Sequence, residues 1–376
     1  MTTLPEFRLE TYFAKWEFSA KYHLTASDAQ SRSVRELLEL ADEDGRRRWD
    51  ELTLGYTESR GMPELREAIA ATFDSLAADD ILCFAGAEEA LYLVPQALLG
   101  PDDHAVVLTP NYQAAETVPL AICEVTGVAL RAEDDWALDV DAIEAALRPN
   151  TRLVSVNFPN NPTGALPGDA EWLRLVRLCD ERGITLLSDE VYRGLEWDAT
   201  AALPQAADLS ATAVSVGVMS KAYGLPGLRI GWIATRDHAL LDRVARAKDY
   251  TTICNSAPSE VLALIALRAR ETLLERNRGI IAENIPQFDA FFAKHTDLFE
   301  WRAPDGGCVA FPRYLGADGV ERMCADLVEQ AGVLLLPASL YASQLTATPT
   351  DRFRIGVGRL DPAPALAAWD GWLASR

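Results

Sequence analysis

The chain has 376 residues, 49% hydrophobic and 24% charged, which indicates a globular protein with room for one large and one smaller domain. Its net charge of −21 argues against nucleic acid and anionic membranes as partners, because both are bound by basic patches. The chain shows no apolar run of about 18 residues, no Cys-x-x-Cys pair and only isolated histidines, so we expect no membrane span, no histidine-based metal site, and reduced thiols in the cytoplasm.

From about residue 80, short apolar runs alternate with amphipathic helical stretches, the first of them predicted over residues 88–99. Apolar runs of this length, separated by helices, are typical of a parallel sheet covered on both faces. In such sheets, ligands bind at the carboxyl ends of the strands. The predicted strands cover residues 81–84, 105–108, 153–156, 184–187 and 213–216.

The last third of the chain has a different pattern, which predicts a smaller α+β lobe completed by the N-terminal segment. We therefore divide the chain into a large domain, residues 50–265, and a small domain formed by residues 1–49 and 266–376. The elements predicted in this part are helical stretches over 256–294 and 319–331, a glycine-containing segment at 306–311, and strand-like runs at 333–336 and 353–356.

Lys221 is one of only five lysines, and it lies in a glycine-rich loop, Ser220–Trp232, between two apolar runs. A lysine on a tight loop suits a Schiff base to an aldehyde cofactor, and Arg229 offers a cation for that cofactor's phosphate. The alternative is that Lys221 carries only a solvated charge, as most lysines do. The other lysines, Lys248 among them, lie in segments with the pattern of ordinary helical surface.

Polar residues follow the predicted strands where such a cofactor needs them. Asp189 comes just after a buried strand, where a carboxylate can pair with a protonated pyridine nitrogen, although an aspartate there is also a common turn or helix cap. Its neighbour Glu190 should point to the opposite face of the sheet. Asn161 and Tyr192 can donate hydrogen bonds to the cofactor's phenolic oxygen, although Asn-Pro-x-Gly, the sequence that Asn161 begins, is also a generic turn.

A phosphate site is predicted at the start of the helix that follows the first strand. Gly86 precedes this helix, so the free N–H groups of Ala87 and Glu88 can converge on an anion. Arg229 would add a positive charge. Tyr112 offers an aromatic ring to stack on the cofactor, or is equally a core residue.

Arg354 lies inside a strand-like apolar run, where an arginine is costly unless an anion meets it. A substrate carboxylate would match its bidentate fork, and an internal salt bridge is the rival explanation. The first interpretation predicts an α-amino acid or an α-keto acid as the substrate.

The Lys221 loop, Asn160-Asn161-Pro162-Thr163-Gly164 and Asp189-x-x-Tyr192 together resemble the class I/II aminotransferases, which are aspartate-aminotransferase-like, fold-type-I enzymes dependent on pyridoxal phosphate. The resemblance runs from about Tyr56 to Arg354 and implies an α/β fold, with a mainly parallel seven-stranded sheet between helices and a smaller α+β domain. It implies catalytic roles for Lys221, Asp189 and Tyr192, with Lys221 forming the Schiff base and moving the proton. It further implies that Asp189 pairs with the pyridine nitrogen, Asn161 and Tyr192 bind the phenolic oxygen, Arg229 binds the phosphate, and Arg354 with Asn161 binds the substrate.

The resemblance also implies a homodimer, because Tyr56 looks like the tyrosine that reaches the phosphate of the neighbouring subunit. The sequence departs from the family pattern in two places. Val218 stands where many relatives have a phosphate-binding serine, which leaves Ser220 as the cofactor-binding candidate on that side. Residues 24–31 replace a glycine-containing loop that closes over the substrate in many relatives.

We expect the enzyme to move an amino group between an α-amino acid and an α-keto acid. The same residues also allow elimination, cyclisation or oxidation of an amino acid, and a non-catalytic effector-binding module is a third alternative. No second arginine can be assigned to a side-chain carboxylate, so strict specificity for aspartate or glutamate is not expected. We expect the polar, uncharged segment 249–256 to lie at the dimer interface near the substrate side chain, with Tyr12, Phe13, Trp16 and Tyr22 of the N-terminal segment nearby. This combination favours a medium-sized neutral or basic substrate side chain.

Overall fold

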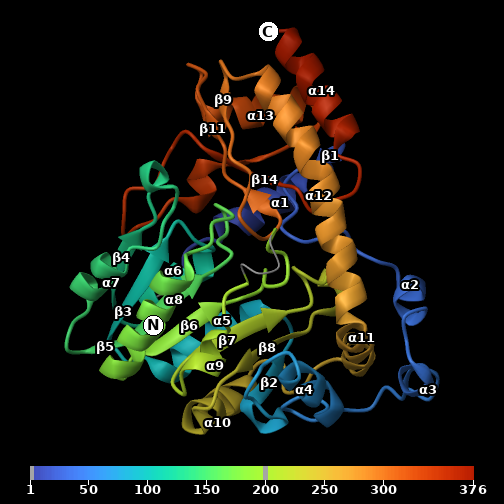
Figure 1. The fold of residues 1–376 in the computed structure, drawn as a ribbon, viewed down its shortest axis with the longest axis vertical. Helices are drawn as coiled ribbons and strands as arrows, with labels where there is room; N and C mark the ends of the chain where they lie inside the picture. Colours follow the sequence, from blue (N-terminus) through green and yellow to red (C-terminus); the bar gives the residue numbers. More distant parts are fainter. Residues whose placement is uncertain (1–3, 198–201) are drawn as a thin grey trace.

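In the computed structural model, which describes residues 4–197 and 202–376, the centre of the chain forms a seven-stranded sheet between helices (Figure 1). The strand order is β2-β8-β7-β6-β5-β3-β4. Neighbouring strands are parallel except at β8, which runs antiparallel to both β2 and β7. The predicted α/β class with a mainly parallel sheet is confirmed. The strands are β2 (Ile81–Phe84), β3 (His104–Thr109), β4 (Glu124–Ala129), β5 (Thr151–Asn157), β6 (Thr185–Asp189), β7 (Val214–Val218) and β8 (Gly231–Ala234).

The central strands form because helices bury both of their faces. In β5, Leu153, Val154 and Val156 are all buried, so the strand shows a continuous apolar run instead of alternation. Two strands of the sheet, β4 and β8, were not predicted from the sequence. β4 lies at the sheet edge and is mostly half-exposed, and β8 begins at Gly231, inside the segment that we took as the Lys221 loop.

The helices of this part each present an apolar stripe to the sheet or to a neighbouring helix. In α8 (Asp169–Arg182) the buried residues Trp172, Leu175, Val176 and Cys179 recur at spacings of three and four, as expected for one helix face. The helix ends at Gly183, whose left-handed φ of 63° favours glycine. The other helices are α4 (Pro63–Ala70), α5 (Ala87–Leu98), α6 (Gln113–Leu120), α7 (Val140–Ala146), α9 (Ala206–Leu209), α10 (His238–Lys248) and α11 (Ala257–Arg268).

The long helix α12 (Arg270–Lys294) runs along one side of the molecule from α11 to the C-terminal elements (Figure 1). Even so, no helix in the described part of the chain is both long and apolar enough to cross a membrane. The C-terminal elements form short sheets, of which the largest has the order β10-β14-β13. They are β9 (Phe299–Glu300), β10 (Val309–Ala310), β11 (Arg313–Tyr314), α13 (Val320–Ala331), β12 (Val333–Leu334), β13 (Leu336–Pro337), β14 (Phe353–Gly356) and α14 (Ala363–Ala374).

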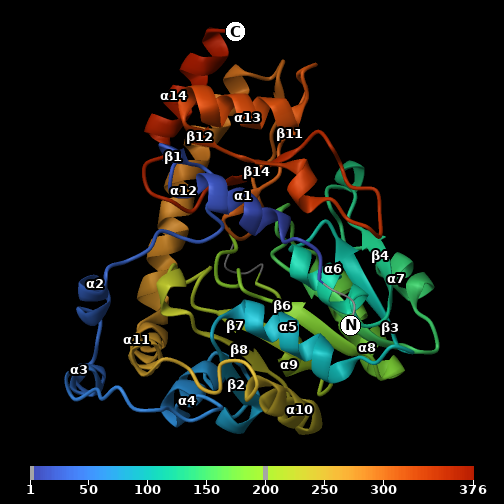
Figure 2. The same ribbon diagram turned by 180° about the vertical axis from the view of Figure 1, so that it is seen from behind.

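The N-terminal segment is divided between two places. The helix α1 (Arg8–Trp16) lies between the C-terminal elements and the sheet (Figure 2), and β1 (Tyr22–His23) pairs in parallel with β12. In contrast, α2 (Val34–Leu38) and α3 (Glu43–Asp50) pack against α11. The division of the chain at residues 50 and 265 stays a prediction.

Lys248 corrects one expectation, because this lysine at the end of α10 is only 1% exposed. Its Nζ donates to the carbonyl oxygens of Ser59, at 2.9 Å, and Ile253, at 3.0 Å. These hydrogen bonds replace the water that a buried ammonium loses. They also tie the loop after α10 to the segment that precedes α4.

Candidate active site

The carboxyl ends of β5, β6 and β7 meet at one edge of the sheet, and a cavity of about 770 Å³ opens there. The helix α1 contributes Leu9, Glu10 and Phe13 to the wall of this cavity. Every site residue predicted from the sequence lines this cavity except Tyr56. The residues brought together are Ala87, Glu88, Tyr112, Asn161, Asp189, Tyr192, Ser220, Lys221, Arg229 and Arg354.

Lys221 follows the end of β7, and its Nζ donates to the Oγ of Ser27 at 2.8 Å. The backbone of the same loop is held as well, because Ala29 N donates to the Lys221 carbonyl oxygen at 3.1 Å. Burial lowers the pKa of the Lys221 amine, and the Arg354 guanidinium lowers it further, against an opposing effect of Asp28. A lowered pKa increases the neutral fraction of the amine, which is the form that attacks a carbonyl carbon or accepts a proton.

Asp189 ends β6 directly beside Asn157 of β5. Burial raises the pKa of its carboxyl to about 7, and two interactions oppose this rise: a hydrogen bond from Val191 N, at 3.2 Å, and the charge of Lys221. A cation against this carboxylate would favour its ionised form. The residue therefore suits a protonated ring nitrogen.

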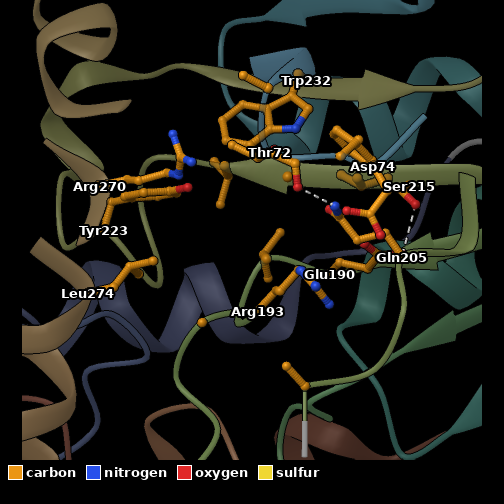
Figure 3. A pocket seen from close by; sticks show the side chains of 18 of the residues that line it. Thr72, Asp74, Glu190, Arg193, Gln205, Ser215, Tyr223, Trp232, Arg270 and Leu274 are labelled. Atoms are coloured by element: carbon orange, nitrogen blue, oxygen red, sulfur yellow. Dashed lines mark hydrogen bonds between the residues drawn. The ribbon is translucent and has the colours of Figure 1, made fainter. Parts of the chain in front are cut away.

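Glu190 points to the other side of the same strand, as the pleat of a strand requires. Its Oε1 accepts from Ala206 N at 3.0 Å and from Ser215 Oγ at 2.8 Å. It lines a second cavity of about 360 Å³ (Figure 3). Val191 and Val218 line both cavities and so form the wall between them.

An anion cradle lies where α5 begins, formed by the backbone N–H groups of Ala87 and Glu88 and the guanidinium of Arg229. Gly86 precedes α5 with a φ of 98°, and a Cβ at this position would lie 2.5 Å from Nη2 of Arg229. The guanidinium thus lies directly over the start of the helix, near the free N–H groups of Ala87 and Glu88, and Ser220 Oγ accepts from Arg229 Nη1 at 3.4 Å. Helix N–H groups and a guanidinium converging on one point fit a phosphate group.

Tyr112 lies at the start of α6 and lines the cavity, with its hydroxyl near the Glu88 carboxylate. Burial, followed by the charge of Glu88, raises the pKa of the Tyr112 hydroxyl. Burial likewise raises the pKa of Glu88, while the hydrogen bond from Tyr112 lowers it. The tyrosine ring therefore forms part of the cavity wall beside the anion cradle.

Arg354 is fully buried in β14. Its Nη1 donates to Asn161 Oδ1 at 3.1 Å and its Nη2 to the Thr25 carbonyl oxygen at 2.7 Å, whereas Nε has no partner. Within residues 4–197 and 202–376 no carboxylate forms an ion pair with Arg354, so its positive charge is not neutralised by the protein. Asn161 is held through its oxygen, which leaves its NH2 group to donate.

The hydroxyl of Tyr192 also lacks a partner. The Tyr192 side chain is only 1% exposed. Ser27 lies near its hydroxyl, but the hydroxyl makes no hydrogen bond of normal geometry. An unpartnered buried hydroxyl facing a cavity costs stability unless a ligand meets it. Together with the uncompensated Arg354 and the anion cradle, it shows that these residues fit pyridoxal phosphate and a carboxylate substrate.

The sequence reasoning missed several residues of the wall. Arg359 is a second arginine there, and Asp28 pairs with its Nη2 at 2.8 Å, so its charge is compensated. Arg359 follows Arg354 by five residues, just beyond the same strand, and that proximity could have flagged it. Ser27 gave no signal, because a serine in an irregular segment carries no periodicity.

Tyr56 lies outside the cavity of its own chain and is 93% exposed. Its predicted contact with a phosphate therefore requires a second subunit.

The fold and the cavity together define a fold-type-I enzyme built around pyridoxal phosphate. The family model described as aminotransferase class I and II matches residues 25–364, and the chain belongs to this family. Pyridoxal phosphate is accordingly its cofactor.

Two curated relatives are similar to the chain over different lengths. Capreomycidine synthase of Streptomyces vinaceus is 32% identical over 355 residues, which cover 94% of this chain and 89% of the relative. Arginine–pyruvate transaminase AruH of Pseudomonas aeruginosa is 35% identical over 189 residues, or 47% of each chain.

Two solved structures match the whole fold. A PLP-dependent aminotransferase from Streptococcus suis superposes with a TM-score of 0.91 at 28% identity, over 100% of this chain and 99% of the other. The PLP-dependent cyclase OrfR superposes with a TM-score of 0.89 at 26% identity, over the same shares.

Proposed function

We propose that the protein transfers the amino group of an α-amino acid to an α-keto acid, with Lys221 as the residue that binds the cofactor and moves the proton. The observation that carries this proposal is the convergence of Lys221, Asp189 and Arg354 on one cavity. These residues supply an amine of lowered pKa, a carboxyl for a ring nitrogen, and a guanidinium without a carboxylate partner.

Pyridoxal phosphate, when bound, supplies an aldehyde for covalent attachment of an amino group and a ring that accepts the electrons of the α-carbon. The anion cradle of Gly86, Ala87 and Arg229 would hold the phosphate. Tyr192 and Asn161 would donate to the phenolic oxygen, and Asp189 would keep the ring nitrogen protonated.

The remaining residues position the substrate and its proton. Arg354 binds the α-carboxylate through the donor that no protein group uses, and Asn161 fixes the orientation of its guanidinium. Ser27 holds Nζ of Lys221, so the amine is placed to take a proton from the α-carbon of the substrate and deliver it to the carbon of the cofactor's aldehyde, as amino transfer requires.

The experiment follows the nitrogen atom. The purified protein with pyridoxal phosphate is given a 15N-labelled α-amino acid and a different α-keto acid, and products are read by mass spectrometry. Transfer predicts that the label appears in the amino acid that corresponds to the added keto acid. Label released as ammonia, or kept in the original carbon skeleton, would contradict the proposal.

Cyclisation is the second candidate, and the similarity to the cyclase OrfR over the whole chain favours it. The same cavity residues would serve, since proton removal by Lys221 also begins that chemistry. In the labelling experiment, cyclisation predicts a product that keeps its own nitrogen and forms without the added keto acid.

We also propose that the protein is a homodimer. Leu54, Tyr56, Tyr250 and Ile253 are exposed apolar side chains, with Tyr250 93% exposed, and their segments are joined by Thr57 Oγ1 donating to the Asn255 carbonyl oxygen at 3.0 Å. Exposed apolar side chains on two segments joined in this way are typical of a subunit interface. Analytical ultracentrifugation of the wild type should give a mass of about twice 41.1 kDa, and a monomer would exclude the shared site implied for Tyr56.

The cytoplasm is the proposed location. Cys83, Cys179, Cys308 and Cys324 are buried free thiols, as expected for a protein kept in a reducing compartment. Fractionation of producing cells should recover the protein with the cytoplasmic enzymes, and recovery from the medium or membranes would refute this.

A further inference from the structure

Two carboxylates, Glu10 of α1 and Glu17 directly after this helix, lie exposed at the rim of the cavity. Glu10, Phe13 and Glu17 follow one another at spacings of three and four residues, so they share one face of the helix, and all three line the cavity. In the part of the chain that the structure describes, neither Glu10 nor Glu17 takes part in an ion pair or a side-chain hydrogen bond. Burial raises the pKa of Glu17, the nearby Glu10 and Asp28 raise it further, and the charge of Arg359 lowers it.

The other charges of the wall have partners or roles. Asp28 is paired with Arg359, and Glu88 interacts with Tyr112. Under the proposed function, Asp189 faces the ring nitrogen of the cofactor. The carboxylates left over are therefore Glu10 and Glu17, in the part of the wall contributed by α1.

A substrate amino acid has one end fixed in this cavity. Arg354 and the hydroxyl of Tyr192 are buried polar groups with unpartnered atoms, and both line it. With the α-carboxylate held at Arg354, the substrate side chain is free to extend toward α1. There it meets two negative charges and the ring of Phe13, a combination that suits a cation, since cations bind both carboxylates and aromatic faces.

We propose that Glu10 and Glu17 select amino acids whose side chain ends in a positive charge, a guanidinium or an ammonium group. This inference rests on the proposed function, because it takes the α-carboxylate to lie at Arg354. An acidic side chain would be repelled by the same two carboxylates, and the charge of Arg359 is largely balanced by its partner Asp28. A neutral side chain would lose the attraction without being repelled.

The test compares charged amino acids with neutral ones of similar shape. The apparent affinity for arginine and citrulline, and for lysine and norleucine, is measured as the amino acid concentration that half-saturates the change in the absorption spectrum of the cofactor-loaded protein without a keto acid. We expect the cationic member of at least one pair to bind about two- to fivefold more tightly, the range for an exposed charge pair. The arginine pair reports on a guanidinium and the lysine pair on an ammonium group.

Two double variants separate the site from the net charge. Glu10→Gln with Glu17→Gln should remove the preference and leave citrulline and norleucine binding unchanged. Glu6→Gln with Glu39→Gln is the matched control, since it changes the net charge equally at two exposed residues outside the cavity, and it should keep the preference.

Equal binding of charged and neutral partners by the wild type would overturn the inference, as would a preference that survives in the Glu10/Glu17 variant. Either result leaves the proposed function standing if labelled nitrogen is still transferred to a keto acid. Failure of nitrogen transfer alongside a clear binding preference would instead reject the transfer reaction and keep the selectivity.

Discussion

The sharpest prediction concerns Gly86, which forms the floor of the anion cradle. Gly86→Ala places a Cβ 2.5 Å from Nη2 of Arg229, whereas carbon and nitrogen atoms normally stay about 3.5 Å apart. The guanidinium must therefore move by about 1 Å or more. We expect it to leave the position from which it would bind the phosphate together with the start of α5.

The size of the effect follows from two separate terms. Loss of one hydrogen bond to a charged group costs about 1.5–3 kcal/mol, which corresponds to about 10–100-fold weaker cofactor binding. The φ of 98° at Gly86 adds a folding cost of about 1–3 kcal/mol for any residue with a Cβ. The first term acts on cofactor affinity and the second on stability.

Gly183→Ala is the control that separates these terms. Gly183 also has a positive φ, 63°, but a Cβ there would meet no atom within 4 Å. Pyridoxal phosphate is titrated into cofactor-free wild type and both variants by absorption, and thermal unfolding is followed in parallel. Both variants should be less stable, but only Gly86→Ala should bind the cofactor more weakly. Equal affinity in Gly86→Ala and wild type would refute the anion cradle.

Three further predictions concern the chemistry of the cavity. Lys221→Ala should lower single-turnover amino transfer by about 10³-fold or more, because it removes both the attachment point and the proton carrier; turnover within tenfold of wild type would exclude this role. Asp189 has a folded pKa of about 7, above the unfolded value of about 3.9, so the cofactor-free protein should lose stability as the pH rises from about 4 through 7. Asp189→Asn should remove that loss of stability. If wild type and Asp189→Asn give parallel curves of melting temperature against pH, the raised pKa of Asp189 is contradicted. Arg354→Gln should raise the KM for the amino acid by about 10–100-fold, as expected for loss of a hydrogen bond between charged groups, with cofactor affinity unchanged; an unaltered KM would place the carboxylate elsewhere.

The sequence predicts well what depends on local pattern. Continuous apolar runs mark β5 and β6 because both faces of these strands are buried. The polar residues that follow them, such as Asp189, then fall at one sheet edge because parallel strands share their direction. The Lys221 loop is likewise visible through its glycines.

What the sequence hides depends on contacts between distant segments. Lys248 has the pattern of a surface residue and is buried only because carbonyl groups of two loops meet its Nζ. Ser27 reaches Lys221 across 194 positions of the chain. Glu10 and Glu17 are exposed residues, and only the packing of α1 against distant segments brings them to the rim of the cavity.

The absorption spectrum of the purified protein with pyridoxal phosphate, before and after addition of single amino acids, tests the central claim most directly. We predict a band near ~410–430 nm from the cofactor held at Lys221, replaced by one near ~330 nm, the region of the amine form of the cofactor, as one equivalent of keto acid appears. A band that persists with every amino acid while ammonia or a cyclised product accumulates would contradict amino transfer. Absence of any such band would contradict the assignment of Lys221 itself.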